Sequence, residues 1–241
     1  MKSLRITIFV LLAICVRGAM ADPVIQLNVT GQNPLNTSGQ MGFMDEVAGE
    51  ALKRIGYQLK TLQLPAERGL KNANKGIIVD GEMSRVAGLN KKYANLVRVP
   101  EKIMDWEFVA FSYKPVSLAG GWSDLSKKSI AHINGWKILE KNIPNTAEIT
   151  RTSSAENLFN LLRKKRTDYV IYERWGGRYI LEKMTMNGVQ LCKNPLAVKE
   201  MFIYLHKKHE NLVPKLSASL LAMKQDGSYQ KLFNKHLKQF E

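Results

Sequence analysis

The sequence predicts an α/β protein with two lobes, each a mostly parallel sheet flanked by helices, joined by two crossover strands. Strand-like stretches alternate with amphipathic helical stretches in two series, and the glycines at 120 and 121 separate the series. Two aromatic and β-branched stretches, residues 106–113 and 201–205, have no helix beside them. We therefore interpret them as strands that cross between the lobes.

The first series reads β-α-β-α-β. A polar loop rich in Gly, Asn and Pro follows the first strand, and Gly56 ends the first helix. Pro65 begins the second helix, Gly76 stops it, and the apolar stretch after Gly76 is expected to be a buried parallel strand. The predicted elements are strand 24–30, loop 31–40, helix 41–55, strand 57–63, helix 65–75 and strand 77–80.

The second series repeats the alternation. Ser153 and Glu156 have the spacing of a capping box and are expected to begin a helix that contains leucines at 158, 161 and 162. The other predicted elements are strand 129–133, helix 136–142, strand 147–151, strand 169–172 and helix 175–186. The last helices, 212–223 and 229–240, are expected to return to the first lobe. The predicted first lobe is therefore residues 22–110 with 202–241, and the second is residues 111–201.

The N-terminus predicts export. Lys2 and Arg5 precede an apolar stretch, and Ala19-Met20-Ala21 provides a small-x-small cleavage site, so residues 1–21 are expected to be a leader that is removed. A membrane anchor would need roughly 20 apolar residues, and Arg17 ends this stretch early. Lipid attachment at Cys15 is disfavoured, because the bulky Ile14 precedes it. We expect a periplasmic protein that does not span the membrane after cleavage.

The chain is strongly basic, with 36 Lys and Arg against 21 Asp and Glu. The predicted leader carries three of the basic residues, which leaves 33 against 21. The cations are dispersed, and the densest run, residues 163–166, closes an amphipathic helix, so nucleic acid is not an expected partner. The charge is consistent with a solvated surface, or with a field that attracts anionic solutes or an anionic membrane.

The sequence shows no catalytic or metal-binding motif. It contains no Gly-x-Ser-x-Gly, no His-Glu-x-x-His and no phosphate-binding glycine loop. His206 and His209 are three residues apart but flank a strand end with two lysines, and Cys192 is the one cysteine left after cleavage. We therefore expect no metal, no cofactor, no disulfide and no enzymatic activity.

From about residue 24 to 240 the chain resembles the family 3 extracellular solute-binding proteins of ABC-type uptake systems. The resemblance rests on residues 42–46 with Ala48 and Ala51-Leu52 in the helix after the first strand, on residues 163–172, and on Gly227-Ser228-Tyr229 with Leu232-Phe233 near the end. It implies a clamshell of the periplasmic-binding-protein type, which closes on a small polar solute, amino-acid-like or an organic anion. It also implies a monomer that delivers the solute to a membrane permease.

The chain departs from that family at two binding positions. Family members that bind amino acids have Thr-x-x-Arg after the third strand, where this chain has Ala-Gly-Leu-Asn at 87–90 and the nearby Arg85. The second lobe's usual hydroxyl-rich helix start is replaced by Gly135-Trp136-Lys137. Glu173 does match the position at which the family places an acid for the ligand ammonium, although it also suits the start of the following helix.

Seven residues are candidates for the ligand site. Arg68 is in the first turn of the helix after Pro65, where a guanidinium suits a carboxylate, but an exposed salt bridge explains it equally well. Glu82 and Arg85 directly follow the strand predicted at 77–80, and a local ion pair is their alternative explanation. The full predicted set is Arg68, Glu82, Arg85, Trp106, Trp136, Lys137 and Glu173, with the tryptophans as pocket walls or core.

Two other functions remain open at the sequence level. Cyclohexadienyl dehydratases resemble these binders and need only a carboxylate in a closed cleft. A sensory binder that presents its ligand to a receptor has the same sequence features as a transport protein.

Overall fold

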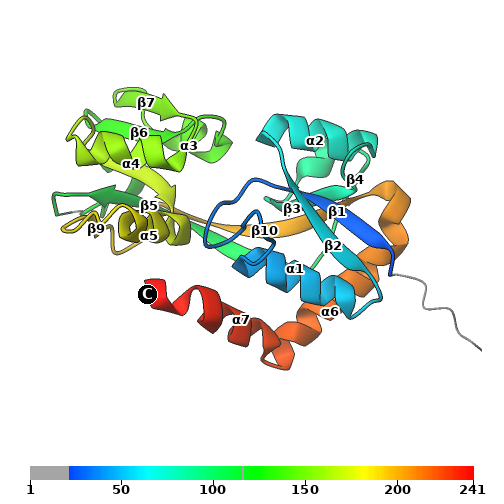
Figure 1. Cartoon of the computed structure of the whole chain (residues 1–241). Coiled ribbons are helices and arrows are strands. Elements are labelled where there is room, and N and C mark those ends of the chain that lie inside the picture. Colours follow the sequence, from blue (N-terminus) through cyan, green and yellow to red (C-terminus); the bar gives the residue numbers. More distant parts are fainter. Residues whose placement is uncertain (1–21, 116) are drawn as a thin grey trace, which may run out of the picture.

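The computed structural model describes residues 22–115 and 117–241, so the predicted leader lies outside the described residues. The strands follow one hydrogen-bonded order, β2-β1-β3-β10-β5-β8-β6-β7, with β4 beside β10 and β9 beside β5. Helices flank this curled sheet on both halves (Figure 1). No helix in the described part of the chain is long and apolar enough to cross a membrane.

The first half is built around β1, which pairs in parallel with both β2 and β3. Its helix α1 follows β1 and its helix α2 follows β2, as the βαβ alternation predicts. The elements of this half are β1 (Val24–Val29), α1 (Phe43–Lys53), β2 (Gln58–Gln63), α2 (Ala66–Lys75), β3 (Gly81–Arg85) and β4 (Leu96–Arg98).

The second half is built around β6, which pairs in parallel with both β7 and β8. Each half therefore has a parallel core, which confirms the predicted fold class. The elements of this half are β6 (Ser129–Ile133), α3 (Lys137–Asn142), β7 (Glu148–Thr152), α4 (Ala155–Arg163), β8 (Tyr169–Glu173), α5 (Arg174–Lys183) and β9 (Gln190–Leu191).

Two long strands connect the halves. The first is β5 (Met104–Ser112) and the second is β10 (Ala197–His206), and they pair with each other in antiparallel register. The far end of β5 pairs with β8, and the far end of β10 pairs with β3 and β4. Each strand thus belongs to both halves, so a change in their twist would move one half relative to the other.

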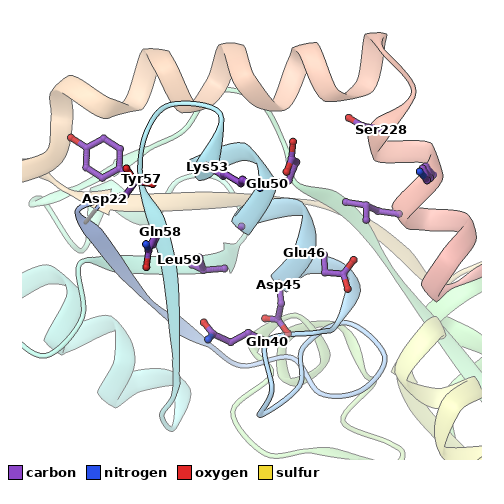
Figure 2. Close-up of a pocket in the computed structure, with 13 residues that line it drawn as sticks. Asp22, Gln40, Asp45, Glu46, Glu50, Lys53, Tyr57, Gln58, Leu59 and Ser228 are labelled. Carbon is purple, nitrogen blue, oxygen red and sulfur yellow. The ribbon is translucent and has the colours of Figure 1, made fainter. Parts of the chain in front are cut away.

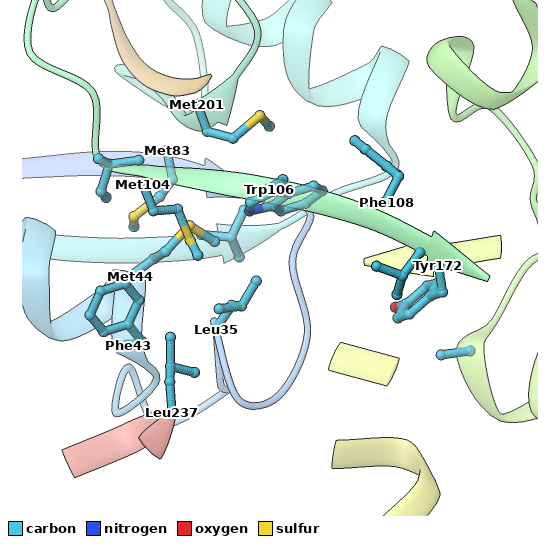
Figure 3. Close-up of a cluster of buried hydrophobic side chains, with 14 of the residues drawn as sticks. Leu35, Phe43, Met44, Met83, Met104, Trp106, Phe108, Tyr172, Met201 and Leu237 are labelled. Atoms are coloured by element: carbon cyan, nitrogen blue, oxygen red, sulfur yellow. The ribbon is translucent and has the colours of Figure 1, made fainter. Parts of the chain in front are cut away.

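The helices after β10 lie against α1. They are α6 (Val213–Gln225) and α7 (Ser228–His236). The Ser219 hydroxyl donates to the Ala51 carbonyl oxygen at 2.9 Å, and the ring of Phe43 meets that of Tyr229 edge-on at 5.4 Å. The apolar core continues from α1 through Met104 and Trp106 on β5 towards the second half (Figure 3).

The predicted strand at 77–80 is wrong, because the strand begins at Gly81. Ile77 and Ile78 are 50% and 56% exposed, and Ile78 has φ of +64° in the turn after α2. A β-carbon at Gly81 would collide with the backbone oxygen of Tyr204. Only glycine therefore lets β3 begin this close to β10, and the apolar residues before it are left in the turn.

Two smaller expectations also differ from the structure. The cap of α4 is Ser154, whose Oγ accepts from the Asn157 amide at 3.2 Å, and not Ser153. The predicted helix at 229–240 ends at His236, and a short 3₁₀ turn, Lys238–Phe240, follows it.

Candidate functional site

A pocket of about 270 Å³ lies between the two halves. The loop after β1 and the end of β2 form one wall, and α4, β8 and α5 form the other. A hollow of about 210 Å³ beside it shares the first wall. The pocket is lined by Gln32, Asn33, Asn36, Thr37, Ser38, Gln63, Glu156, Tyr172, Tyr179, Ile180 and Lys183.

Asp45 of α1 holds the first wall in place. Its carboxylate accepts from the Asn36 side-chain amide at 2.6 Å, from the Thr37 backbone amide at 2.7 Å and from the Gly42 backbone amide at 3.1 Å. Asp45 is buried, and this burial raises its pKa against the effect of these hydrogen bonds. The loop therefore presents its amides and hydroxyls from a fixed backbone.

The second wall combines a charge pair with aromatic rings. Lys183 Nζ lies 3.2 Å from Glu156 Oε1, and both side chains are about half exposed. Tyr172 and Tyr179 add aromatic surface. Because the pair is accessible, a polar solute can replace either partner with its own charged group.

Tyr172 also belongs to a group of four aromatic rings, together with Trp106, Phe108 and Trp136. The ring of Trp136 stacks on Tyr172 at 4.9 Å and contacts Phe108 at 5.7 Å and Trp106 at 5.9 Å. Figure 3 shows Trp106 and Phe108 along β5 with Tyr172 beyond them. The structure thus brings the two predicted tryptophans together where β5 meets β8, but as packed rings and not as walls of the interlobe pocket.

Glu173 is the last residue of β8 and caps α5. Its two carboxylate oxygens accept from the backbone amides of Trp175 at 3.1 Å and Gly176 at 2.8 Å. Its side chain is almost fully buried, and burial raises its pKa to about 7. Glu173 therefore caps the start of α5, which is the structural role that the sequence also allowed, and it does so from a buried position.

Glu82 and Arg85 lie within β3 and not beyond its end, which corrects the expectation based on a strand at 77–80. Arg85 Nε donates to Glu82 Oε2 at 2.7 Å, and Arg85 Nη2 donates to the Ala66 carbonyl oxygen at 3.2 Å. Asn28 of β1 donates to both oxygens of Glu82. Burial raises the pKa of Glu82, and the Arg85 charge opposes this. The pair connects β1, β3 and the start of α2.

The remaining candidates are exposed. Arg68 is in the first turn of α2, and Lys137 begins α3, where its Nζ lies 2.7 Å from Glu140 Oε2. Figure 1 shows α2 and α3 on the facing sides of the two halves. Arg68, Arg85 and Glu173 do not line the interlobe pocket or the hollow beside it. The loop from Gln32 to Ser38 was not predicted as part of the site, although its place directly after a parallel strand was a usable signal.

A larger hollow, about 680 Å³, lies outside the interlobe region, between α1, β2 and α7 (Figure 2). Carboxylates of α1 line it, but Glu46 is paired with Lys235 at 2.6 Å and Glu50 with Arg54 at 2.9 Å. Its lining includes no residue of the second half. Because Glu46 and Glu50 are already paired and only one half contributes to this hollow, we regard the smaller interlobe pocket as the candidate site.

Comparison with known proteins identifies the fold. No protein-family model matches the chain. An uncharacterized protein of Shewanella oneidensis is 27% identical over 190 residues, which are 75% of this chain and 70% of that protein.

Solved structures match over nearly the whole chain. The substrate-binding protein of an amino acid ABC transporter has a TM-score of 0.71 at 19% identity, covering 90% of this chain and all of that one. A mutant of ArgBP from T. maritima has a TM-score of 0.72 at 17% identity, covering 89% and 95%. A histidine kinase sensor domain similar to periplasmic binding proteins has a TM-score of 0.71 at 14% identity, covering 90% and 96%. The chain therefore has the two-lobed fold of the periplasmic binding proteins.

Proposed function

We propose that the protein binds a small polar solute between its two halves and closes on it. The observation that carries this proposal is the interlobe pocket, whose walls come from the loop after β1 on one side and from α4, β8 and α5 on the other. A solute that contacts both walls links the halves, so rotation about β5 and β10 would bury it. The description of the solved neighbours as substrate-binding proteins supports this role.

The lining indicates the chemical class of the solute. Side-chain amides and hydroxyls of the first wall suit polar groups, Lys183 suits a carboxylate, and Glu156 suits an ammonium group. The solute is accordingly amino-acid-like or an organic anion, and its binding requires no cofactor.

The cellular role follows from the resemblance and the N-terminal residues. We expect export to the periplasm with cleavage after Ala21, action as a monomer, and delivery of the solute to the permease of an ABC-type uptake system. N-terminal sequencing of periplasmic protein tests the export step. A chain that keeps Met1 in the cytoplasm would contradict it. A receptor that reads the closed form is the alternative partner.

A thermal-shift screen tests the binding proposal. Amino acids, polyamines and organic acids are added to the folded protein, and a solute at about 100 times its Kd should stabilise it by about 2.7 kcal/mol. At least one compound should raise the melting temperature and remain chemically unchanged. A screen without any stabilising compound would contradict solute binding.

Glu173 favours a second candidate function. Its carboxyl group, whose pKa is raised to about 7 by burial, directly follows the pocket residue Tyr172 on β8. If a movement of the lining exposes it to the solute, it can donate a proton at neutral pH, as a cyclohexadienyl-dehydratase-like enzyme requires. Incubation of each stabilising compound with the protein, followed by mass spectrometry, separates the two functions. Consumption of the compound that stops in Glu173→Gln, with binding retained, would support the enzyme and contradict simple binding.

A further inference from the structure

We infer that the end of the first half farthest from the pocket is a docking surface for an anionic lipid membrane. This surface, the distal tip, consists of the turn after α2, the start of β1 and the start of the 3₁₀ helix Lys207–Leu212 that follows β10. Figure 1 shows these segments at the end of the molecule opposite to β6 and β7. The inference goes beyond solute binding and does not depend on it.

Exposed apolar side chains mark the distal tip. Ile77 and Ile78 are 50% and 56% exposed, and Val24 at the start of β1 is 50% exposed. The Ile78 carbonyl oxygen accepts from the side chain of Gln26, which lies two residues after Val24 on the same face of β1. The three apolar side chains therefore belong to one surface.

The backbone at Ile78 is a second, independent observation. Its φ of +64° is a left-handed conformation that a β-branched residue rarely adopts. Glycine or asparagine would fit this position with less strain. The backbone of this turn serves the fold, because the Ile78 carbonyl oxygen accepts from Gln26 and Val79 is buried. The exposed Ile78 side chain adds no packing, so it is better explained by a contact made outside the chain.

Cations surround the apolar residues. Lys75 ends α2, and Lys207 and Lys208 follow β10, all with exposed side chains. Lys208 Nζ donates to the Gly76 carbonyl oxygen at 3.3 Å, which places this lysine beside the turn. It also lies 2.7 Å from Asp80, whose side chain is only 18% exposed, and Glu210 is a further acid on the same 3₁₀ helix. With Lys208 paired to Asp80, the cations nearest the isoleucines that have no acid partner in the described structure are Lys75 and Lys207, while the exposed acids nearby are Glu210 and, before β1, Asp22. The proposed attraction to an anionic surface therefore depends on Lys75 and Lys207.

The shape of the tip favours a membrane over a protein partner. A short protruding turn with isolated apolar side chains can enter the headgroup region of a bilayer, whereas a stable protein interface buries roughly 800 Å² on each partner. The lysines of the tip are attracted to an anionic lipid surface, and the net positive charge of the whole chain adds a long-range attraction to the same surface. The docked protein would keep its interlobe pocket, at the other end of the first half, accessible to solute.

Vesicle co-sedimentation of the chain without residues 1–21 tests the inference. The protein should bind vesicles that contain phosphatidylglycerol and not vesicles of phosphatidylcholine alone, and binding should weaken as salt rises above about 0.1 M. Ile77→Ser with Ile78→Gly should lower binding at least about tenfold. Lys75→Gln and Lys207→Gln should each lower it roughly fivefold.

Two controls keep the result interpretable. Met41→Ser removes another exposed apolar side chain, 66% exposed, outside the distal tip and should leave vesicle binding unchanged. Ile78→Gly should keep or raise the melting temperature, because glycine accepts positive φ, so unfolding cannot explain lost binding. Equal sedimentation with both kinds of vesicle, or with the double isoleucine variant, would overturn the inference. So would binding through the tip to a purified permease without any vesicle affinity.

Discussion

Glu82 and Arg85 form a buried charge pair that connects β1, β3 and α2. Glu82 is 1% exposed, and the Arg85 side chain is 14% exposed. Removal of one partner of such a pair leaves an uncompensated charge in the interior. We predict that Arg85→Ala lowers the free energy of unfolding by about 3 kcal/mol and the melting temperature by roughly 10 °C, measured by circular dichroism.

A double variant separates the stability lost with the charge pair from the stability lost with the volume of the arginine side chain. Arg85→Ala with Glu82→Gln removes both charges and should recover part of the lost stability, because no buried charge remains. If Arg85→Ala kept the stability of the parent but abolished solute binding, Arg85 would be a ligand residue and its structural role would be wrong.

Glu173 should make stability depend on pH in a defined direction. Its pKa is about 7 in the folded state and near 4.5 when unfolded, so the folded state holds the proton more tightly. The stabilising contribution of the protonated form is complete below pH 4.5 and is lost as pH rises towards 7. The total loss is at most about 3.5 kcal/mol, since the pKa shift is about 2.5 units and one unit corresponds to about 1.4 kcal/mol.

Glu173→Gln isolates this effect, since other buried carboxyl groups are unchanged in both proteins. Urea titrations at several pH values should show that the variant gains stability relative to the parent between pH 4.5 and 7. A constant difference between parent and variant across this range would mean that the pKa of Glu173 is not raised.

At the scale of one helix, α4 offers a matched pair of serines. Ser154 caps the helix through its hydroxyl, whereas Ser153, which precedes it, is not the cap. Ser154→Ala should therefore cost about 1 kcal/mol of stability, and Ser153→Ala much less. Chemical denaturation measures both, and an equal loss in the two variants would contradict the cap assignment.

The elements also show what the sequence could predict. The alternation of strands and helices predicted the parallel cores, because hydrophobic periodicity depends on local spacing. The prediction of a strand at 77–80 failed because an apolar stretch of this length is typical of a buried strand. The start of β3 depends instead on the close approach of Gly81 to Tyr204. That contact joins residues distant in the sequence, so local patterns cannot reveal it.

The candidate site was less predictable for the same reason. Arg85 is a reasonable ligand candidate by its position, but its guanidinium already donates a hydrogen bond to the Glu82 carboxylate. Lys183 and Glu156 lie on different helices, and only their packing brings them within 3.2 Å. Sequence spacing therefore indicated the ends of parallel strands, where the candidate pocket also lies, but not the side chains that meet there.

At the scale of the whole molecule, β5 and β10 give the protein a connection that both halves share. The interlobe pocket lies where movement about this connection changes the distance between its walls. We therefore expect a solute to be held by both halves at once, and not by either half alone.

Isothermal titration calorimetry with the solute found in the screen, on one variant from each wall, tests this claim most directly. Gln63→Ala changes the first wall, Lys183→Ala changes the second, and Lys53→Ala changes only the outer hollow. Lys183→Ala should weaken binding by roughly ten- to hundredfold and Gln63→Ala by about fivefold, while Lys53→Ala keeps the parent affinity. Parent affinity in both wall variants, or a loss confined to one wall or to Lys53→Ala, would contradict binding between the halves.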